Sequence, residues 1–88
     1  MAITPTKDQV QERITAAITS FGPTTNQVVP EATWGQLGID SLHLVELAEI
    51  ASEDYGVQLQ GQDFEDLTTV GEAIDLIWSR AQSAHPAN

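Results

Sequence analysis

The sequence contains no cysteine, only 3 lysine and arginine residues, and no apolar run of membrane-spanning length. Without cysteine the chain cannot form a disulfide, and any thiol chemistry has to come from an attached group. The segment 1–6 lacks the basic and apolar regions of a signal peptide. These absences predict a cytoplasmic protein that has no membrane partner.

The shortage of basic residues leaves a large excess of negative charge. The chain has 13 acidic residues and a formal net charge of -10, and neither lysine nor arginine occurs between Arg13 and Arg80. A nucleic-acid backbone would be repelled, so we expect no nucleic-acid partner. Two interpretations of the acids stay open: they keep a small domain in solution, or they meet a partner with a basic surface.

Apolar residues recur at the spacing of an amphipathic helix in three segments of the 88-residue chain. The first predicted helix has about 14 residues and ends before Gly22-Pro23. The second runs from about Ser41 to Tyr55, where Gly56 suits its end, and the third begins at Val70. Capping signals stand at the start of all three segments: Thr4-Pro5 or Thr6 with Gln9 for the first, Asp40 for the second, and Thr69 with Glu72 for the third.

The remaining segments are a long loop over 24–36 and the stretch 63–67, which can form one helical turn. No run of strand-like alternation occurs. The sequence therefore predicts an all-α fold, a small four-helix bundle with three main helices, one short helix and a long first loop. We expect a single domain, 1–88, with a core of about 5–82 and a frayed tail at 83–88.

The stretch Leu37-Gly38-Ile39-Asp40-Ser41-Leu42 places a serine at the start of the second helix. Gly38 permits backbone angles that other residues resist, and Asp40 is a favoured N-cap, so Ser41 falls at the first helical position. The unpaired amides and the positive dipole end of a helix start tolerate a phosphate well. A glycine turn and a cap with no further role are the alternative interpretation of this pattern.

The string Gly-Ile-Asp-Ser-Leu, followed by Val45-Glu46-Leu47, resembles the attachment motif of acyl carrier proteins, and the resemblance extends from Trp34 to Ile77. It implies that a phosphopantetheinyl transferase moves 4′-phosphopantetheine from coenzyme A to Ser41, which Asp40 presents by capping the helix. The protein would then be a monomeric carrier and not an enzyme. It would present acyl thioesters to partners such as acyltransferases, ketosynthases or acyl-loading enzymes with basic docking surfaces.

The residues around the motif bear on the kind of carrier. Trp34 stands three residues before Leu37, which resembles polyketide carriers, whereas many fatty-acid carriers have the aromatic one residue farther upstream. We therefore expect a discrete carrier of polyketide or related secondary-metabolite biosynthesis, with a fatty-acid carrier as an alternative. A peptidyl or aminoacyl carrier usually has Gly-Gly-x-Ser-Leu, from which Ile39-Asp40 departs. A helical adaptor without an arm is the non-carrier alternative.

Two further positions carry structural expectations. Trp34 is expected to pack on the core, and a platform for a ligand is the alternative. Many carriers of this family have a proline where this chain has Gly61, and the departure predicts a looser loop.

The second predicted helix has an outward arc next to Ser41. Successive residues are about 100° apart on a helix, which directs Leu44, Leu47, Ala51 and Tyr55 inward. We expect the outward arc to dock partner enzymes, although single exposed apolar residues are ordinary. The expected docking face consists of Leu42, Val45, Glu46, Glu49 and Glu53, and Ser52 is placed on the same arc.

Catalytic and metal chemistry find little support in the sequence. His43 is two residues from Ser41, and side chains two apart on a helix point away from each other, so it is not placed to act as a base. The Gly-x-Ser-x-Gly elbow of hydrolases is absent. The sequence also has no Cys/His cluster and no calcium loop of alternating acids, so we expect no metal site.

Overall fold

The computed structural model of the protein describes residues 5–84, and these residues are mainly helical. No strand occurs within 5–84, where Thr33 and Thr69 form a single isolated bridge. The predicted all-α fold is therefore confirmed. In chain order the elements are α1 (Lys7–Thr19), the 3-10 turn η1 (Thr25–Gln27), α2 (Trp34–Leu37), α3 (Ser41–Tyr55), α4 (Gly61–Glu65) and α5 (Val70–Ala84).

The helix α2 overlaps the end of the segment 24–36, which was predicted to be a loop, so the structure has one short helix more than the sequence predicted. Two short helices, α2 and α4, accompany the three long ones. α2 begins with a capping box, in which the Gln36 N–H donates to Thr33 Oγ1 (3.2 Å) and the Thr33 N–H donates to Gln36 Oε1 (2.9 Å). It ends at Gly38, whose φ of 67° is left-handed. Four residues are too few to show a helical period.

The predicted start of the last helix is confirmed, but its predicted end is not. The Glu72 N–H donates to Thr69 Oγ1 (3.3 Å), so α5 begins at Val70 as expected. The helix continues through Ser83 and Ala84, where fraying had been predicted. The rest of the predicted tail, 85–88, lies outside the described residues.

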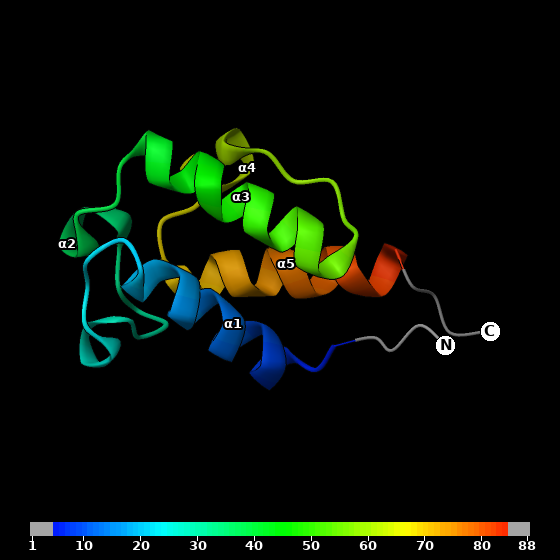
Figure 1. Cartoon of the computed structure of the whole chain (residues 1–88), viewed down its shortest axis with the longest axis horizontal. Helices are drawn as coiled ribbons and strands as arrows, with labels where there is room; N and C mark the ends of the chain where they lie inside the picture. The colour runs from blue at the N-terminus through cyan, green and yellow to red at the C-terminus, as the bar shows by residue number, and fades with distance from the viewer. Residues whose placement is uncertain (1–4, 85–88) are drawn as a thin grey trace.

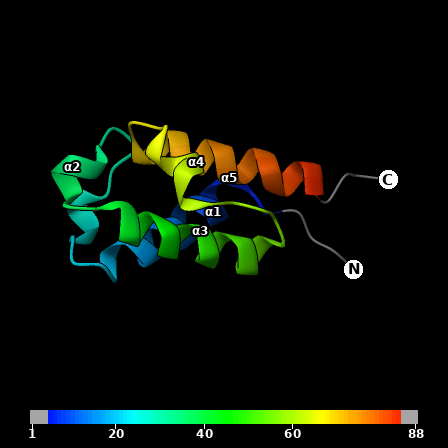
Figure 2. The same cartoon turned by 90° about the horizontal axis from the view of Figure 1, so that it is seen from above.

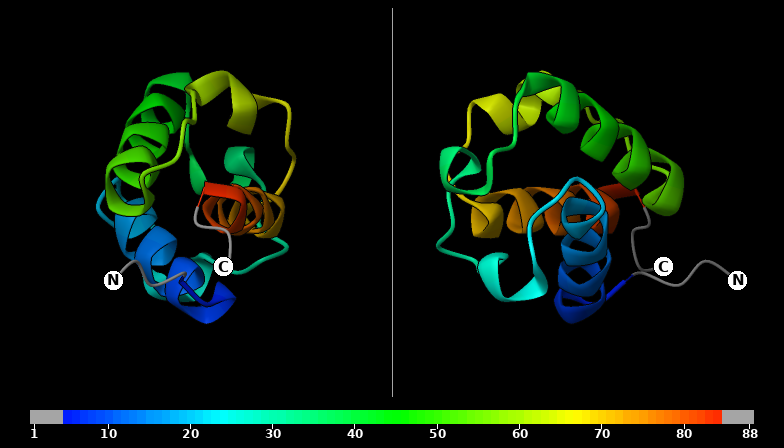
Figure 3. Two further views of the ribbon diagram at one scale, coloured as in Figure 1. Left: turned by 90° about the vertical axis from the view of Figure 1, so that its right-hand side faces the viewer. Right: turned by 60° about the vertical axis from the view of Figure 1, so that its left-hand side comes forward.

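A single core lies between the long helices and α4. Figure 3 shows α1, α3 and α5 around the middle of the bundle, with α4 on the side between α3 and α5. Fully burying one large apolar side chain stabilises a fold by about 1.5–3 kcal/mol. The largest fully buried side chains come from all four helices and are Phe64, Ile14, Ile18, Leu47, Ile77, Val10 and Val70.

The three basic residues of the chain connect different helices. Lys7 joins α1 to α5, Arg13 joins α1 to α3, and Arg80 joins α5 to α4. Partly exposed pairs of this kind contribute only about 0.2–1 kcal/mol each. Their main consequence is electrostatic, because most acidic side chains are left facing solvent without a lysine or arginine. The pairs are Lys7–Asp75 (2.6 Å), Arg13–Asp54 and Arg80–Asp63 (4.0 Å).

The bundle has two distinct ends. α2, η1, the α4–α5 connection and the start of α3 gather at one end, on the left of Figure 1, and Figure 2 shows the same grouping from above. α1 begins and α5 ends at the opposite end. Among residues 5–84, no helix combines the length and apolarity that a membrane span requires.

Candidate functional site

The start of α3 is built as the sequence predicted. Asp40 has an extended backbone (φ -101°, ψ -177°), and its Oδ1 accepts the N–H of His43 at 3.0 Å. Its carbonyl accepts the N–H of Leu44 at 3.1 Å, so Ser41 is the first helical residue. The left-handed Gly38 ends α2 only two residues before Asp40. The chain therefore turns sharply between two helices, and Ser41 lies at the corner.

Ser41 meets the chemical requirements of a phosphate-bearing attachment point. Its side chain is exposed, and Ser41 is the first residue of a 15-residue helix, whose dipole favours negative charge at this N-terminal end. The backbone N–H of His43 donates to the Asp40 side chain, whereas the backbone N–H groups of Ser41 and Leu42 have no partner within the helix. These two amides are free to bind water or a phosphate oxygen. α3 itself contributes no lysine or arginine that could neutralise such a phosphate.

The predicted docking face of α3 is exposed beside Ser41. Leu42 is 74% exposed and Val45 is 45% exposed, which makes them two of the most exposed large apolar residues in the described chain. Glu46, Glu49 and Glu53 are exposed on the same helix. The residues predicted to face inward do so: Leu44, Leu47 and Ala51 are buried, and Tyr55 is half-buried.

Ser52 does not belong to this open arc, so its predicted placement was wrong. The side chain is half-buried, and its hydroxyl donates to the carbonyl of Ala48 (2.7 Å). The Leu59 N–H donates to Ser52 Oγ at 3.3 Å. The segment after α3 therefore folds back and covers this side of the helix.

Gly61 lies in close contact with the docking face, and the predicted looser loop was wrong. The glycine is buried as the first residue of α4. A Cβ on Gly61 would lie 2.8 Å from Val45 Cγ2, 3.1 Å from Val45 N and 3.2 Å from Val45 Cα. Glycine is thus what allows α4 to pack directly on the α3 backbone at Val45.

Trp34 packs in the core, as predicted, and does not form an open platform. It is 8% exposed, and its Nε1–H donates to the carbonyl of Phe64 at 3.1 Å. This bond connects α2 to α4, and so it supports the corner that leads to Ser41.

His43 has contacts that the sequence did not predict. The Asp40 N–H donates to His43 Nδ1 at 3.3 Å, and the imidazole stacks on Phe21 with ring centroids 4.9 Å apart. The pattern of a capping box normally has glutamate or glutamine at this third helical position. The spacing of Asp40 and His43 was the available signal, but the residue type concealed it.

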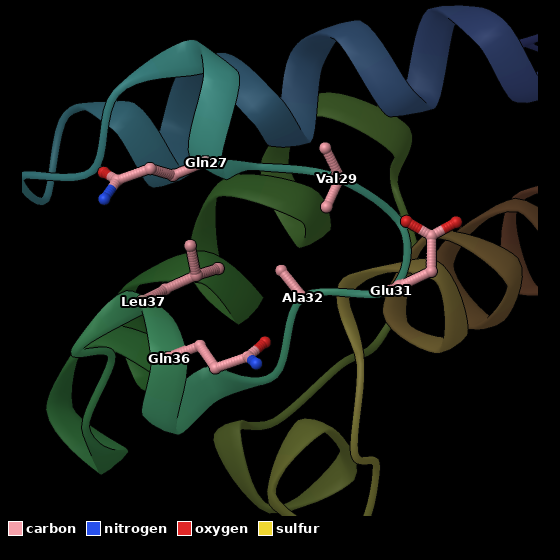
Figure 4. Close-up of a pocket in the computed structure, with 6 residues that line it drawn as sticks. All are labelled: Gln27, Val29, Glu31, Ala32, Gln36 and Leu37. Carbon is pink, nitrogen blue, oxygen red and sulfur yellow. The ribbon is translucent and has the colours of Figure 1, made fainter.

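A surface pocket of about 450 Å³ lies beside α2, at the same end of the molecule as the start of α3. Figure 4 shows that its walls come from the first loop and α2. The lining contains one carboxylate and no basic side chain, which makes it unsuitable for an anionic ligand. Within residues 5–84, no group of three His, Cys, Asp or Glu side chains could hold a metal ion. The pocket residues are Gln27, Val29, Glu31, Ala32, Gln36 and Leu37.

Comparison with known proteins identifies the family. A family model described as the phosphopantetheine attachment site matches residues 12–77. The acyl carrier protein of Chlorobium phaeobacteroides is 36% identical over 74 residues, which cover 82% of this chain and 95% of the relative. The acyl carrier protein of Acidothermus cellulolyticus is 38% identical over 64 residues, which cover 72% of this chain and 76% of the relative. The chain therefore belongs to the acyl carrier proteins, a family of carriers and not catalysts, with 4′-phosphopantetheine as the covalently attached prosthetic group.

Proposed function

We propose that Ser41 is the residue that carries the phosphopantetheine arm, and that Asp40 presents it. The observation that carries this proposal is the exposed serine at the first position of a capped helix, directly after a sharp corner. The serine also lies inside the matched residues 12–77. Asp40 supports the geometry in two ways, through its side-chain bond to the His43 amide and through its carbonyl bond to the Leu44 amide.

The attachment reaction needs only the hydroxyl of this chain. Ser41 Oγ gives up its proton to a base of the transferase and forms a bond to the pantetheine-bearing phosphorus of coenzyme A. The P–O bond of the pyrophosphate breaks, and adenosine 3′,5′-bisphosphate leaves. Once attached, the arm supplies a terminal thiol that holds an acyl group as a thioester. This chain has no cysteine of its own for that purpose.

Intact mass spectrometry after incubation with coenzyme A, magnesium and a transferase of broad specificity tests the site. The wild-type chain should gain the mass of one arm, and Ser41→Ala should gain none. The variant should stay folded, since an exposed serine contributes little to packing. Ser79→Ala, another exposed serine on a long helix, is the matched control and should gain the arm normally. Arm addition to Ser41→Ala would show that the assignment is wrong.

We further propose that Leu42, Val45, Glu46, Glu49 and Glu53 form the surface that basic partner enzymes bind. The two apolar side chains lie within the arc of glutamates next to Ser41, so a partner that covers them also reaches the arm. All three basic residues of the chain are engaged in ion pairs between helices. The three glutamates of this face are therefore not paired with a lysine or arginine of the chain. The same net charge repels a second copy of the chain, which supports a monomeric carrier.

Transferase kinetics test the docking face. Glu46→Lys should lower kcat/KM, with the difference from wild type shrinking as salt rises, because charges at a rim mainly set the encounter rate. Leu42→Ala should lower kcat/KM about tenfold at every salt concentration, since its loss is buried apolar area worth about 1.4 kcal/mol. Glu12→Lys makes the same charge change on the exposed side of α1 and is the matched control. Equal slowing by Glu12→Lys and Glu46→Lys would mean that net charge governs recognition.

For the pathway, we propose a polyketide or related secondary-metabolite role, supported by the spacing of Trp34 and Leu37. The fatty-acid role is the second candidate, and the family comparison fits both equally well. The mass of the acyl group on protein purified from its own host discriminates between them. A chain that retains oxygen at several positions would support the proposal. A saturated linear chain as the sole cargo would favour the fatty-acid role.

A further inference from the structure

His43 completes the cap of the helix that carries Ser41. Its backbone N–H donates to Asp40 Oδ1 (3.0 Å), and its Nδ1 accepts the N–H of Asp40 (3.3 Å). Both bonds together fix the backbone on either side of Ser41. His43 Nδ1 also lies 3.2 Å from Asp40 Oδ1, so the ring contacts both the backbone and the side chain of Asp40. The ring here performs the role that glutamate or glutamine has in an ordinary capping box.

The same ring connects this cap to another helix. It stacks on Phe21 at a centroid distance of 4.9 Å and an interplanar angle of 30°. Phe21 follows α1, where its N–H donates to the carbonyl of Ile18 (2.9 Å), and its side chain packs against the core. An aromatic pair of this kind contributes beyond its buried area. The first turn of α3 is thus held both by its own cap and by the end of α1.

We propose that His43 is a positioning residue for the transfer of the arm to Ser41. Through Asp40 and Phe21 it holds the first turn of α3 in the orientation that presents the Ser41 hydroxyl. It does not act as a base on Ser41, because side chains two residues apart on a helix point away from each other. This inference rests on the proposed attachment at Ser41.

The experiment measures kcat and KM of a phosphopantetheinyl transferase, with coenzyme A and the purified chain as substrates. His43→Leu keeps apolar bulk against Phe21 and removes the acceptor for the Asp40 N–H. It should lower kcat about three- to tenfold with KM nearly unchanged, the range that one such hydrogen bond supports. His43→Gln restores the acceptor and should recover most of kcat. Phe21→Leu keeps both hydrogen bonds, removes the stacked ring, and should lower kcat about two- to threefold.

Gln9→Leu is the matched control. Gln9 occupies the same third position in the capping box of α1, where its Oε1 accepts the Thr6 N–H at 2.9 Å, and it lies on a different helix from Ser41. This variant loses an equivalent cap and should leave kcat and KM unchanged. A kcat of His43→Leu equal to wild type, a Gln variant as slow as the Leu variant, or a Gln9→Leu variant as slow as either would overturn the proposal. If Ser41→Ala still gains the arm, the proposed attachment site itself is wrong, and that outcome is distinct from the others.

Discussion

Adding one methyl group at Gly61 should destabilise the protein, although alanine is the better helix former. Gly61 is helical and has no positive φ, so propensity alone favours alanine, by less than the value of about 0.5–1 kcal/mol that holds in the middle of a helix. The new Cβ, however, would lie 2.8 Å from Val45 Cγ2 and 3.1 Å from Val45 N. Valine is stiff at χ1, and the backbone of α3 cannot move away alone. Overpacking of this kind costs about 1–3 kcal/mol, so the steric effect dominates.

The expected net loss for Gly61→Ala is about 1 kcal/mol, which lowers Tm by about 4–8 °C in a domain of this size. Thermal unfolding followed by circular dichroism measures it. Gly35→Ala is the matched control, because Gly35 is also helical and a Cβ there meets nothing within 4 Å. That variant should be stabilised by about 0.4–1 kcal/mol. The two glycine substitutions should therefore have opposite signs.

A double-mutant cycle locates the contact. Val45→Ala removes Cγ2, so Gly61→Ala should cost less in that background than in wild type, because only the contacts with the backbone N and Cα of residue 45 should remain. A Tm for Gly61→Ala at or above wild type would refute the steric reasoning. The same penalty in both backgrounds would show that the Val45 side chain is not what resists the methyl group.

Two further predictions concern charge and pH. Ten acidic residues occur from Asp40 to Asp75 without a lysine or arginine among them. Added salt or millimolar divalent cation should therefore raise Tm, by about 5 °C if screening recovers roughly 1 kcal/mol. An unchanged Tm would show that these acids are too far apart to repel one another. Burial, and then the Asp54 carboxylate, raise the pKa of the Tyr55 phenol above its ordinary value of 10.0, against the opposing effect of Arg13. The folded state therefore holds this proton more tightly, and the resulting stability is present below pH 10.0 and is lost as pH rises through the folded-state pKa. Urea titrations should show a smaller loss of unfolding free energy above pH 10.0 for Tyr55→Phe than for wild type, and equal losses would contradict this.

Local signals were enough to predict the long helices. α3 begins after Asp40 and ends before Gly56, as predicted, because an N-cap and a left-handed glycine set the ends of a helix through the backbone next to them. The Thr69–Glu72 box does the same for the start of α5. Exposed Ser41 follows from the same local reasoning, since its position is set by the residue directly before it.

Features that depend on contacts across the chain were not predictable in this way. The burial of Ser52 depends on a segment that returns over α3 after Gly56, and the role of Gly61 depends on how closely α4 approaches Val45. Both features depend on contacts between segments that are separated along the chain, and a single window of sequence does not show such contacts. α2 was missed for a different reason, because its Thr33–Gln36 box was present in the sequence but the helix is too short to show a period.

The separation between the two ends of the bundle has a practical consequence for engineering. α3 starts at one end, whereas α1 begins and α5 ends at the other, and a 15-residue helix such as α3 spans about 22 Å. A fluorophore, a bead or a neighbouring domain joined through the outer turn of α1 or α5 would therefore sit far from the serine. Such a tether would leave the reactive corner facing away from the support, so immobilised protein should still accept its arm and present it to enzymes that diffuse in solution.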